Sequence, residues 1–415
     1  MRPLDYVIFP MLFIGLYTAI FFLYTYYEKR KEIHKMADSP KIFYSVTIIV
    51  PAFNEENTIL KTLNSLLSLN YPKDKLKIMV VDDGSTDNTF KVVKNANFSN
   101  VVIYRKQNGG KYTALNYGLE RCDTEFVGAL DADSFVSKDA LKNMVSYFDD
   151  PLVMAVTPSM RVYKPKSFLQ RVQAIEYLMG LFLRKIFSVL SSEHVTPGPF
   201  TIHRKAFFDK HGFYKKAFHT EDIEVALRIQ SNGYKIRHAS NAAVYTVAPK
   251  SFNVLYKQRI RWYYGFIENL LNYKHLFSIK YGILGVFILP IAFVSVIMVL
   301  FGAGIALFRF FDSVRLFIVK MIVTHFDIVN YFRFGHFDIF YVQLDAITIL
   351  SLISLCIGLF MVVMAKKLSE EKLHLPFNYI LFLIAYWFLF AMWWTVSILY
   401  KITGKQTKWW HKSGK

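Results

Sequence analysis

Long apolar runs at both ends of the chain enclose a middle region in which apolar runs are short. Residues 6–27 are an uncharged apolar run of membrane-spanning length. Arg2 is the only basic residue before this run, so the basic start of a secretory signal peptide is missing, and no small-residue cleavage site follows. We therefore expect a retained transmembrane anchor over residues 1–30. A basic cluster, residues 29–31, comes directly afterwards, which predicts that this end of the anchor is cytoplasmic.

The end of the chain contains three more runs of this length, at residues 283–307, 346–365 and 377–400. They predict a transmembrane region over residues 281–400, followed by a basic tail over residues 401–415. Residues 310–340 are apolar but charged in places, so we expect them outside the membrane or on its surface. Three spans after a cytoplasmic domain place the basic tail outside, against the positive-inside trend. A fourth span near residues 314–331 would put charged side chains into lipid, so the sequence leaves this topology open.

Residues 45–245 have the pattern of an α/β domain. Short apolar runs typical of buried strands recur along it, at residues 46–50, 78–81, 101–104, 126–130 and 153–156. Apolar residues at helical spacing follow the first run, over residues 58–69. Near-continuous apolar strands with helical connections predict a mainly parallel sheet that helices cover on both faces.

Two later stretches, residues 168–190 and 252–271, have apolar residues every three or four positions but are too polar to span a bilayer. In the first, Glu176 and Arg184 lie off the apolar stripe. Such helices either lie on a membrane surface or pack within a domain. The second stretch belongs to an interfacial region that we place at residues 246–280.

The composition supports a chain that is partly soluble and partly embedded in a membrane. Apolar residues make up 53% of its 415 residues, and aromatic residues 17%. Much of the formal net charge of +19 lies beside the apolar segments, a pattern that favours contact with membrane lipid. No nucleic-acid-binding motif is present, so we expect no nucleic-acid partner. Cys122 and Cys356 cannot form a disulfide framework, which fits a reducing, cytoplasmic compartment.

Polar residues follow the predicted strands at the points where ligands bind in an open parallel sheet. The first strand leads into Pro51, Ala52, Asn54 and Glu55, whose polar members can contact a base or cap the next helix. The second strand ends at Asp83, within the sequence Asp-Asp-Gly-Ser. That sequence suits a polar rim for a ligand such as uracil, or an ordinary turn.

Two acidic residues after the fourth strand are the strongest candidates for a metal site. Asp131 and Asp133 are two positions apart, so on an extended chain their side chains face the same side. Neighbouring carboxylates repel each other unless a cation lies between them, and such ligands suit Mg²⁺ or Mn²⁺. A metal ion there neutralises a leaving diphosphate. Lys111, in the sequence Asn-Gly-Gly-Lys, is a further candidate for contacting that diphosphate.

Two downstream motifs carry further candidate chemistry. Glu221 and Asp222 open a helical pattern, either as first-turn acids after an N-cap or with Asp222 as a general base for an acceptor hydroxyl. Residues 258–262 read Gln-Arg-Ile-Arg-Trp. The arginines can hold a diphosphate and the indole offers a platform for a sugar ring, but a basic helix facing anionic lipid has the same composition.

The order of these motifs resembles that of the processive family 2 glycosyltransferases, which include the synthases of cellulose, chitin, hyaluronan and poly-N-acetylglucosamine. The motifs run from Pro-Ala-Phe-Asn-Glu through Asp-Ala-Asp and Thr-Glu-Asp to Gln-Arg-Ile-Arg-Trp, over residues 45–270, and membrane spans flank them. The resemblance implies a GT-A fold, that of nucleotide-diphospho-sugar transferases, with interfacial amphipathic helices and α-helical transmembrane spans.

The resemblance also implies roles for individual residues. Asp222 matches the catalytic base, Asp83 the uridine contact, and Asp131 with Asp133 the pair that binds nucleotide and metal. The implied donor-binding residues are Pro51, Ala52, Asn54, Glu55, Asp83, Lys111, Asp131, Asp133, Gln258, Arg259 and Arg261. The implied acceptor-binding residues are Gly198, Pro199, Phe200, Glu221 and Trp262.

The function implied is inverting, metal-dependent transfer of a sugar from a UDP-sugar to a growing polysaccharide, with its translocation across the plasma membrane. Gly198 and Pro199 slightly favour a UDP-N-acetylhexosamine donor, whereas Pro197 and residues 263–265 depart from the family pattern and leave the acceptor open. One alternative is a single transfer to a lipid-linked acceptor. Another is a non-catalytic membrane transporter or scaffold that keeps the fold. Accessory subunits and oligomeric state are not predicted.

Overall fold

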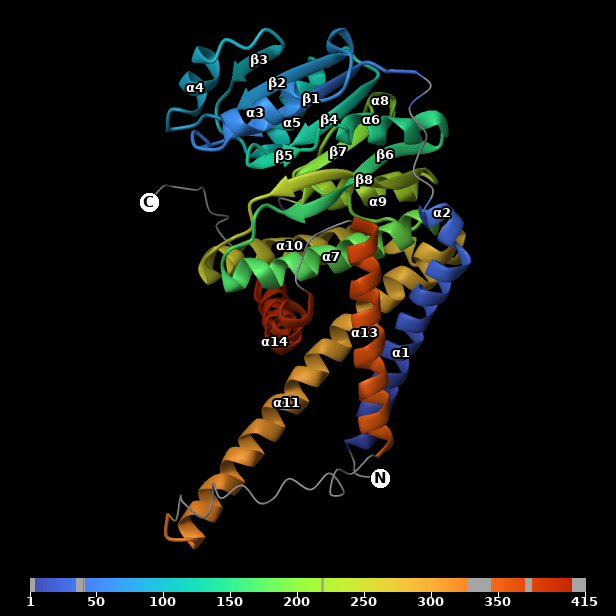
Figure 1. The fold of residues 1–415 in the computed structure, drawn as a ribbon, viewed down its shortest axis with the longest axis vertical. Coiled ribbons are helices and arrows are strands. Elements are labelled where there is room, and N and C mark those ends of the chain that lie inside the picture. The colour runs from blue at the N-terminus through green and yellow to red at the C-terminus, as the bar shows by residue number, and fades with distance from the viewer. Residues whose placement is uncertain are drawn as a thin grey trace.

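The computed structural model describes residues 4–34, 40, 42–217, 220–326, 345–369 and 375–404. Figure 1 shows three layers: a sheet with its helices, two long helices beneath that sheet, and apolar helices that extend away from both. The second layer connects the first to the third.

A mixed sheet of eight strands forms the centre of the first layer. Its strands are β1 (Val46–Ala52), β2 (Leu76–Asp82), β3 (Val101–Arg105), β4 (Phe126–Leu130), β5 (Ser134–Val136), β6 (Val153–Val162), β7 (Phe200–Arg204) and β8 (Lys235–Thr246). Their order is β3-β2-β1-β4-β7-β6-β8-β5. The pairs from β3 to β4 are all parallel, whereas β7 is antiparallel to both β4 and β6. The five predicted strands are confirmed, and β5, β7 and β8 extend the sheet beyond them.

Alternating side chains of the strands build two cores, one on each face of the sheet. Ile48 packs on one face with Leu63 and Met144, and Ile49 on the other with Leu115. The covering helices are α3 (Ile59–Leu67), α4 (Thr89–Asn95), α5 (Lys111–Glu120), α6 (Ala140–Val145), α8 (Lys205–His211) and α9 (Glu221–Ser231). Because β1, β2 and β4 are parallel, their carboxyl ends share one edge, which brings the polar residues after each strand together.

The two amphipathic stretches form α7 (Phe168–Val189) and α10 (Phe252–Asn272), which lie in one layer beneath the sheet (Figure 1). Ser167 starts α7 with a capping box, in which its hydroxyl and the Gln170 side chain satisfy each other's backbone amides. Gln173, off the apolar stripe, is buried and donates to the Pro249 carbonyl at 2.9 Å. The helices therefore pack on the domain along one side and on the apolar helices along the other.

Among the described residues, four helices are long and apolar enough to cross a membrane: α1 (Asp5–Glu28), α11 (Leu289–Val323), α13 (Ala346–Ser369) and α14 (Leu375–Ile402). The helical stretch that includes α11 runs over 40 residues, from Leu284 to Val323. The helix continues to Val323, beyond the apolar run at residues 283–307, and the expectation that residues 310–340 lie outside the span stays a prediction. Residues 327–344 lie outside the described part of the chain.

The last helix, α14, crosses the direction of the others. Figure 1 shows it nearly end-on, whereas α1 and α13 run down the page. Near its C-terminal end, Lys401 forms a 2.6 Å ion pair with Glu268 of α10. Its aromatic residues pack under α10, where Tyr263 contacts both Trp393 and Trp394. This helix therefore lies directly beneath α7 and α10, on the side away from the sheet (Figure 1).

Candidate active site

The loops after β1 and β2 are tied to each other. The Asn54 carboxamide oxygen accepts from the Thr86 backbone amide at 2.8 Å, and Asn54 itself has a left-handed backbone, φ 56°. The Glu55 carbonyl accepts from Thr58 and Ile59, so Glu55 opens α3. Both residues thus shape the rim of the sheet edge, and a base contact by either stays a prediction.

Asp83 lies at the same edge and is almost completely buried. Its carboxylate accepts from Lys106 Nζ at 2.6 Å and from the amides of Gly109 and Gly110 at 3.1 and 2.8 Å. It therefore holds the Gly-Gly loop that leads into Lys111. A uridine contact by Asp83 stays a prediction.

The two acidic residues after β4 are presented by a turn. The strand ends at Leu130, and Ser134 donates to the Asp131 carbonyl at 3.0 Å, so the predicted extended geometry is wrong. Thr62 anchors the turn through a 2.8 Å bond to the Ala132 carbonyl. Asp131 and Asp133 are both half-buried at this edge of the sheet.

Lys111, the first residue of α5, lies among the acidic residues of the site. Its Nζ is 2.5 Å from Asp131 Oδ1 and 3.5 Å from Glu221 Oε1. Burial lowers the pKa of Lys111, but the charges of Asp131 and Glu221 outweigh it and raise that pKa above its usual value. The lysine is therefore a fixed positive charge beside Asp131.

Asp222 faces this group across the loop that precedes β7. Its Oδ2 accepts from the Gly198 amide at 3.2 Å, and its carbonyl accepts from the Thr196 hydroxyl at 2.7 Å. A Cβ on Gly198 would lie 2.8 Å from Lys111 Nζ, 3.6 Å from Asp131 Oδ2 and 3.7 Å from Asp222 Oδ2. Because Gly198 has no side chain, Asp222, the candidate base, can lie close to Lys111 and Asp131.

The environment of Asp222 suits a general base. Burial, together with the neighbouring Glu221 charge, raises the pKa of its carboxyl from 3.8 to about 6, although Lys111 opposes the shift. A carboxylate with a raised pKa accepts a proton more readily near neutral pH.

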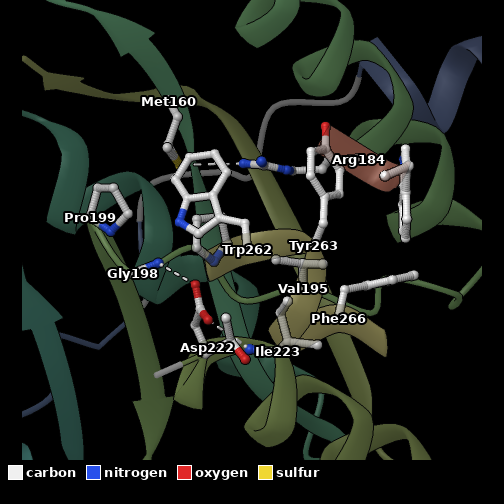
Figure 2. Close-up of a pocket in the computed structure, with 13 residues that line it drawn as sticks. Met160, Arg184, Val195, Gly198, Pro199, Asp222, Ile223, Trp262, Tyr263 and Phe266 are labelled. Atoms are coloured by element: carbon white, nitrogen blue, oxygen red, sulfur yellow. Dashed lines mark hydrogen bonds between the residues drawn. The ribbon is translucent and has the colours of Figure 1, made fainter. Parts of the chain in front are cut away.

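A cavity of about 300 Å³ opens beside Asp222. Figure 2 shows Trp262 over Asp222 and Gly198, with Met160 and Arg184 on the far side. The lining residues are Met160, Arg184, Val195, Pro197, Gly198, Pro199, Thr220, Asp222, Ile223, Trp262, Tyr263, Phe266 and Trp394. Gly198, Pro199 and Trp262, all predicted to bind the acceptor, therefore border one cavity with the candidate base.

The helix that carries Trp262 is held close to the Asp222 turn. Gly265 approaches Thr220 so closely that a Cβ would lie 2.2 Å from the Thr220 hydroxyl. Asn269 donates to that hydroxyl at 2.9 Å. Thr220 makes no side-chain cap for α9, so the N-cap alternative does not account for this residue.

The two arginines of the Gln-Arg-Ile-Arg-Trp motif have different positions. Arg259 has no exposed side-chain surface and pairs with Glu176 of α7 at 2.5 Å, while its guanidinium lies 4.3 Å from the Trp262 ring centre. Arg259 is therefore not at the donor site as predicted. It is buried between Glu176 and the Trp262 ring. Arg261 forms no ion pair with any described residue and lies near enough to lower the Asp222 pKa.

Two more predicted contacts belong to the core. Phe200 is fully buried where β7 pairs with β4, opposite Leu130. Its side chain packs in the core on one face of the sheet and not against an acceptor. The Ala52 side chain is also buried in the core, and its carbonyl accepts from the Asp83 amide at 2.8 Å. Of the other predicted contacts, Pro51 is half-buried, and Glu221 pairs with Lys111. The Gln258 carboxamide oxygen is buried and accepts no hydrogen bond from the described residues.

Several lining residues were not predicted from the sequence, among them Arg184, Met160 and Trp394. Arg184 lay off the apolar stripe of its helix, which was a usable signal, and its guanidinium reaches the Met160 sulfur at 3.4 Å. No such signal exists in the sequence for Met160, which lies within β6, or for Trp394, which lies within a predicted membrane span.

Comparison with known proteins agrees with this geometry. Residues 47–212 match the family described as glycosyl transferase family 2. The chain is 31% identical over 282 residues to a poly-beta-1,6-N-acetyl-D-glucosamine synthase of Staphylococcus aureus, covering 66% of this chain and 67% of the relative. The Staphylococcus epidermidis synthase of that name is 30% identical over the same length and shares.

A solved structure shares the fold. A mannosyltransferase from Pyrobaculum calidifontis, solved with GDP-mannose and Mn²⁺, superposes with a TM-score of 0.56 at 18% identity, covering 95% of this chain and all of its own. The resemblance in fold supports the GT-A architecture of the first layer. The motif order, the matched domain and the relatives agree: the chain is a glycosyltransferase and belongs to glycosyl transferase family 2.

Proposed function

We propose that this chain is a membrane-embedded N-acetylglucosaminyltransferase that extends a polysaccharide from a UDP-sugar donor. The observation that carries the proposal is the cavity in which Asp222, Gly198 and Trp262 meet, next to the Asp131–Lys111 pair and above the apolar helix α14. The synthases to which the chain is about 30% identical suggest the sugar.

The donor would lie on the Asp131 side of Gly198. Asp131 and Asp133 fit a divalent metal ion that is shared with substrate, because Mg²⁺ is typically held by one or two carboxylates plus phosphate oxygens. Asp131 already pairs with the positive charge of Lys111, which supports a role for this carboxylate in holding cations at the site. When bound, such an ion neutralises charge on the diphosphate. Lys111 and Arg261 supply further positive charge from the protein.

The acceptor would lie in the cavity, with one hydroxyl at Asp222. Asp222 takes the proton from that hydroxyl, and the oxygen then attacks the anomeric carbon from the side opposite the diphosphate. A new carbon–oxygen bond forms as the bond to the diphosphate oxygen breaks, so UDP leaves with the bonding electron pair and the anomeric centre inverts. The Gly198 amide, bonded to Asp222, keeps the carboxylate aimed at the cavity.

Contacts of α13 and α14 support a proposed orientation in the membrane. The last turns of α13 bury Val362 and Ala365 in the cluster that holds Phe182 of α7, so α13 ends beside the catalytic layer. Leu375 follows Ser369 by only six positions, a span of about 20 Å at most. Since Lys401 pairs with α10, both ends of α14 lie near the catalytic side. We propose that three helices span the plasma membrane and that α14 lies along its cytoplasmic face.

The test is UDP release by the purified protein in lipid, supplied with UDP-N-acetylglucosamine and Mg²⁺ or Mn²⁺. We expect release by the wild type, its loss on chelation with EDTA, and a drop of at least 1,000-fold for Asp222→Asn, on the order of losing a general base together with its charge. Asp74→Asn, an exposed carboxylate away from the site, is the matched control. Absence of release from a folded wild type would instead support a non-catalytic transporter or scaffold.

A further inference from the structure

We infer that Trp394, on the apolar helix α14, is a sugar-binding residue of the acceptor cavity, acting together with Trp262. This inference rests on the proposed function. Trp394 borders the cavity that contains Asp222, although it lies more than 130 positions further along the chain than Trp262. The cavity is thus completed by a helix of the membrane layer.

The indole of Trp394 is fixed in place by other aromatic rings. Its ring centre lies 4.6 Å from that of Tyr263 and 6.1 Å from that of Phe266, which packs edge-on. Because these rings already order the side chain, binding a sugar against it costs little conformational entropy. A rigid aromatic wall of this kind suits the apolar C–H face of a pyranose ring.

The polar end of the same indole supports this assignment. Trp394 Nε1 is buried and has no hydrogen-bond partner in the described part of the chain. A buried donor without a partner costs free energy, and a sugar hydroxyl or the carbonyl of an N-acetyl group would satisfy it. Because Trp394 borders the cavity, a carbohydrate bound there is the partner that we propose for this donor.

The neighbouring Trp393 provides the comparison. It is fully buried, stacks on Tyr263 at 6.2 Å and lies 5.8 Å from the Arg259 guanidinium, but it does not border the cavity. Its Nε1 also lacks a partner among the described residues, so an unpaired indole nitrogen alone does not distinguish the two. The difference is access to the cavity, and only Trp394 has it.

Steady-state kinetics of UDP release tests the inference, with UDP-N-acetylglucosamine as donor and a soluble N-acetylglucosamine pentasaccharide as acceptor. We expect Trp394→Leu to raise the acceptor KM by about tenfold, the effect of losing roughly 1.4 kcal/mol of binding, with the donor KM unchanged. Trp394→Phe keeps an aromatic face but loses the N–H, so a rise of about threefold is expected. Trp393→Phe should leave the ratio of the two KM values as in the wild type.

Each outcome decides a different point. An active wild type whose acceptor KM is unchanged in both Trp394 variants overturns the inference alone. An equal change of donor and acceptor KM in the Trp393 and Trp394 variants also overturns it, because general loosening of α14 would then explain both. A folded wild type that releases no UDP overturns the proposed function, and this inference with it. If Trp394→Leu does not fold, Trp394→Phe supplies the comparison.

Discussion

Gly265→Ala should lower the catalytic rate in a protein that still folds. The added Cβ would lie 2.2 Å from the Thr220 hydroxyl and 2.5 Å from its Cγ2, whereas carbon atoms in contact stay about 3.5–4.0 Å apart. The α10 helix and the Thr220 turn must therefore separate by roughly 1 Å. Asp222 is two residues from Thr220, so the base moves relative to Trp262 on α10.

The two costs can be estimated separately. Overpacking of this kind destabilises by about 1–3 kcal/mol, and weakening the Asn269–Thr220 hydrogen bond contributes about 1 kcal/mol. Misplacing catalytic groups by about 1 Å lowers the rate by about 100-fold. We therefore expect a folded variant whose kcat for UDP release falls by about two orders of magnitude.

Thermal unfolding and UDP-release kinetics measure the two effects side by side. Gly180→Ala, in the other interfacial helix, is the matched control, because a Cβ there meets no atom within 4 Å. It should leave kcat unchanged and stabilise α7 by up to about 1 kcal/mol. If Gly265→Ala folds and keeps kcat within threefold of the wild type, the contact with Thr220 does not position the base.

Three further predictions follow from the site and its supports. Because Asp222 must be deprotonated to act as a base and its pKa is raised to about 6, kcat/KM should fall about tenfold per pH unit below that value, and a pH–rate profile that is flat down to pH 4.5 would contradict this. Glu176→Gln leaves the buried Arg259 charge without its partner, so the free energy of unfolding should drop by about 3 kcal/mol, measured by chemical denaturation; an unchanged value would mean that the pair is not formed. In a cysteine-free background, an impermeant maleimide should label Thr403→Cys from the same side of the membrane as the control Ser99→Cys; labelling from the opposite side would show that α14 crosses the bilayer.

Much of the fold followed from the sequence because it depends on local patterns. Uninterrupted apolar runs predicted the strands from β1 to β4 and β6, and three-to-four spacing predicted α7 and α10. The length of α11 was underestimated, because Asp312 and Arg315 interrupt the apolar run. These two residues form a 2.8 Å ion pair with each other on one face of the helix, so their charges are compatible with a continuous helix.

The site was predicted unevenly, for a physical reason. Motif order could indicate that Asp131, Asp222 and Trp262 belong together, but it could not show which side chains point inward. Arg259 and Arg261 are two positions apart on a helix and so lie on different faces, one buried against Glu176 and one near Asp222. Trp394 could not be found at all, because only the packing of α14 under α10 brings it to the cavity.

The size of the product tests the central claim most directly. Purified protein in lipid, given UDP-N-acetylglucosamine and a divalent metal ion, should yield a polysaccharide that elutes well above the size of any added acceptor on a sizing column. Its length should grow with time while UDP accumulates in proportion to the sugar incorporated. A product that carries a single added sugar, recovered in the lipid extract, would contradict the claim and identify a lipid-linked acceptor.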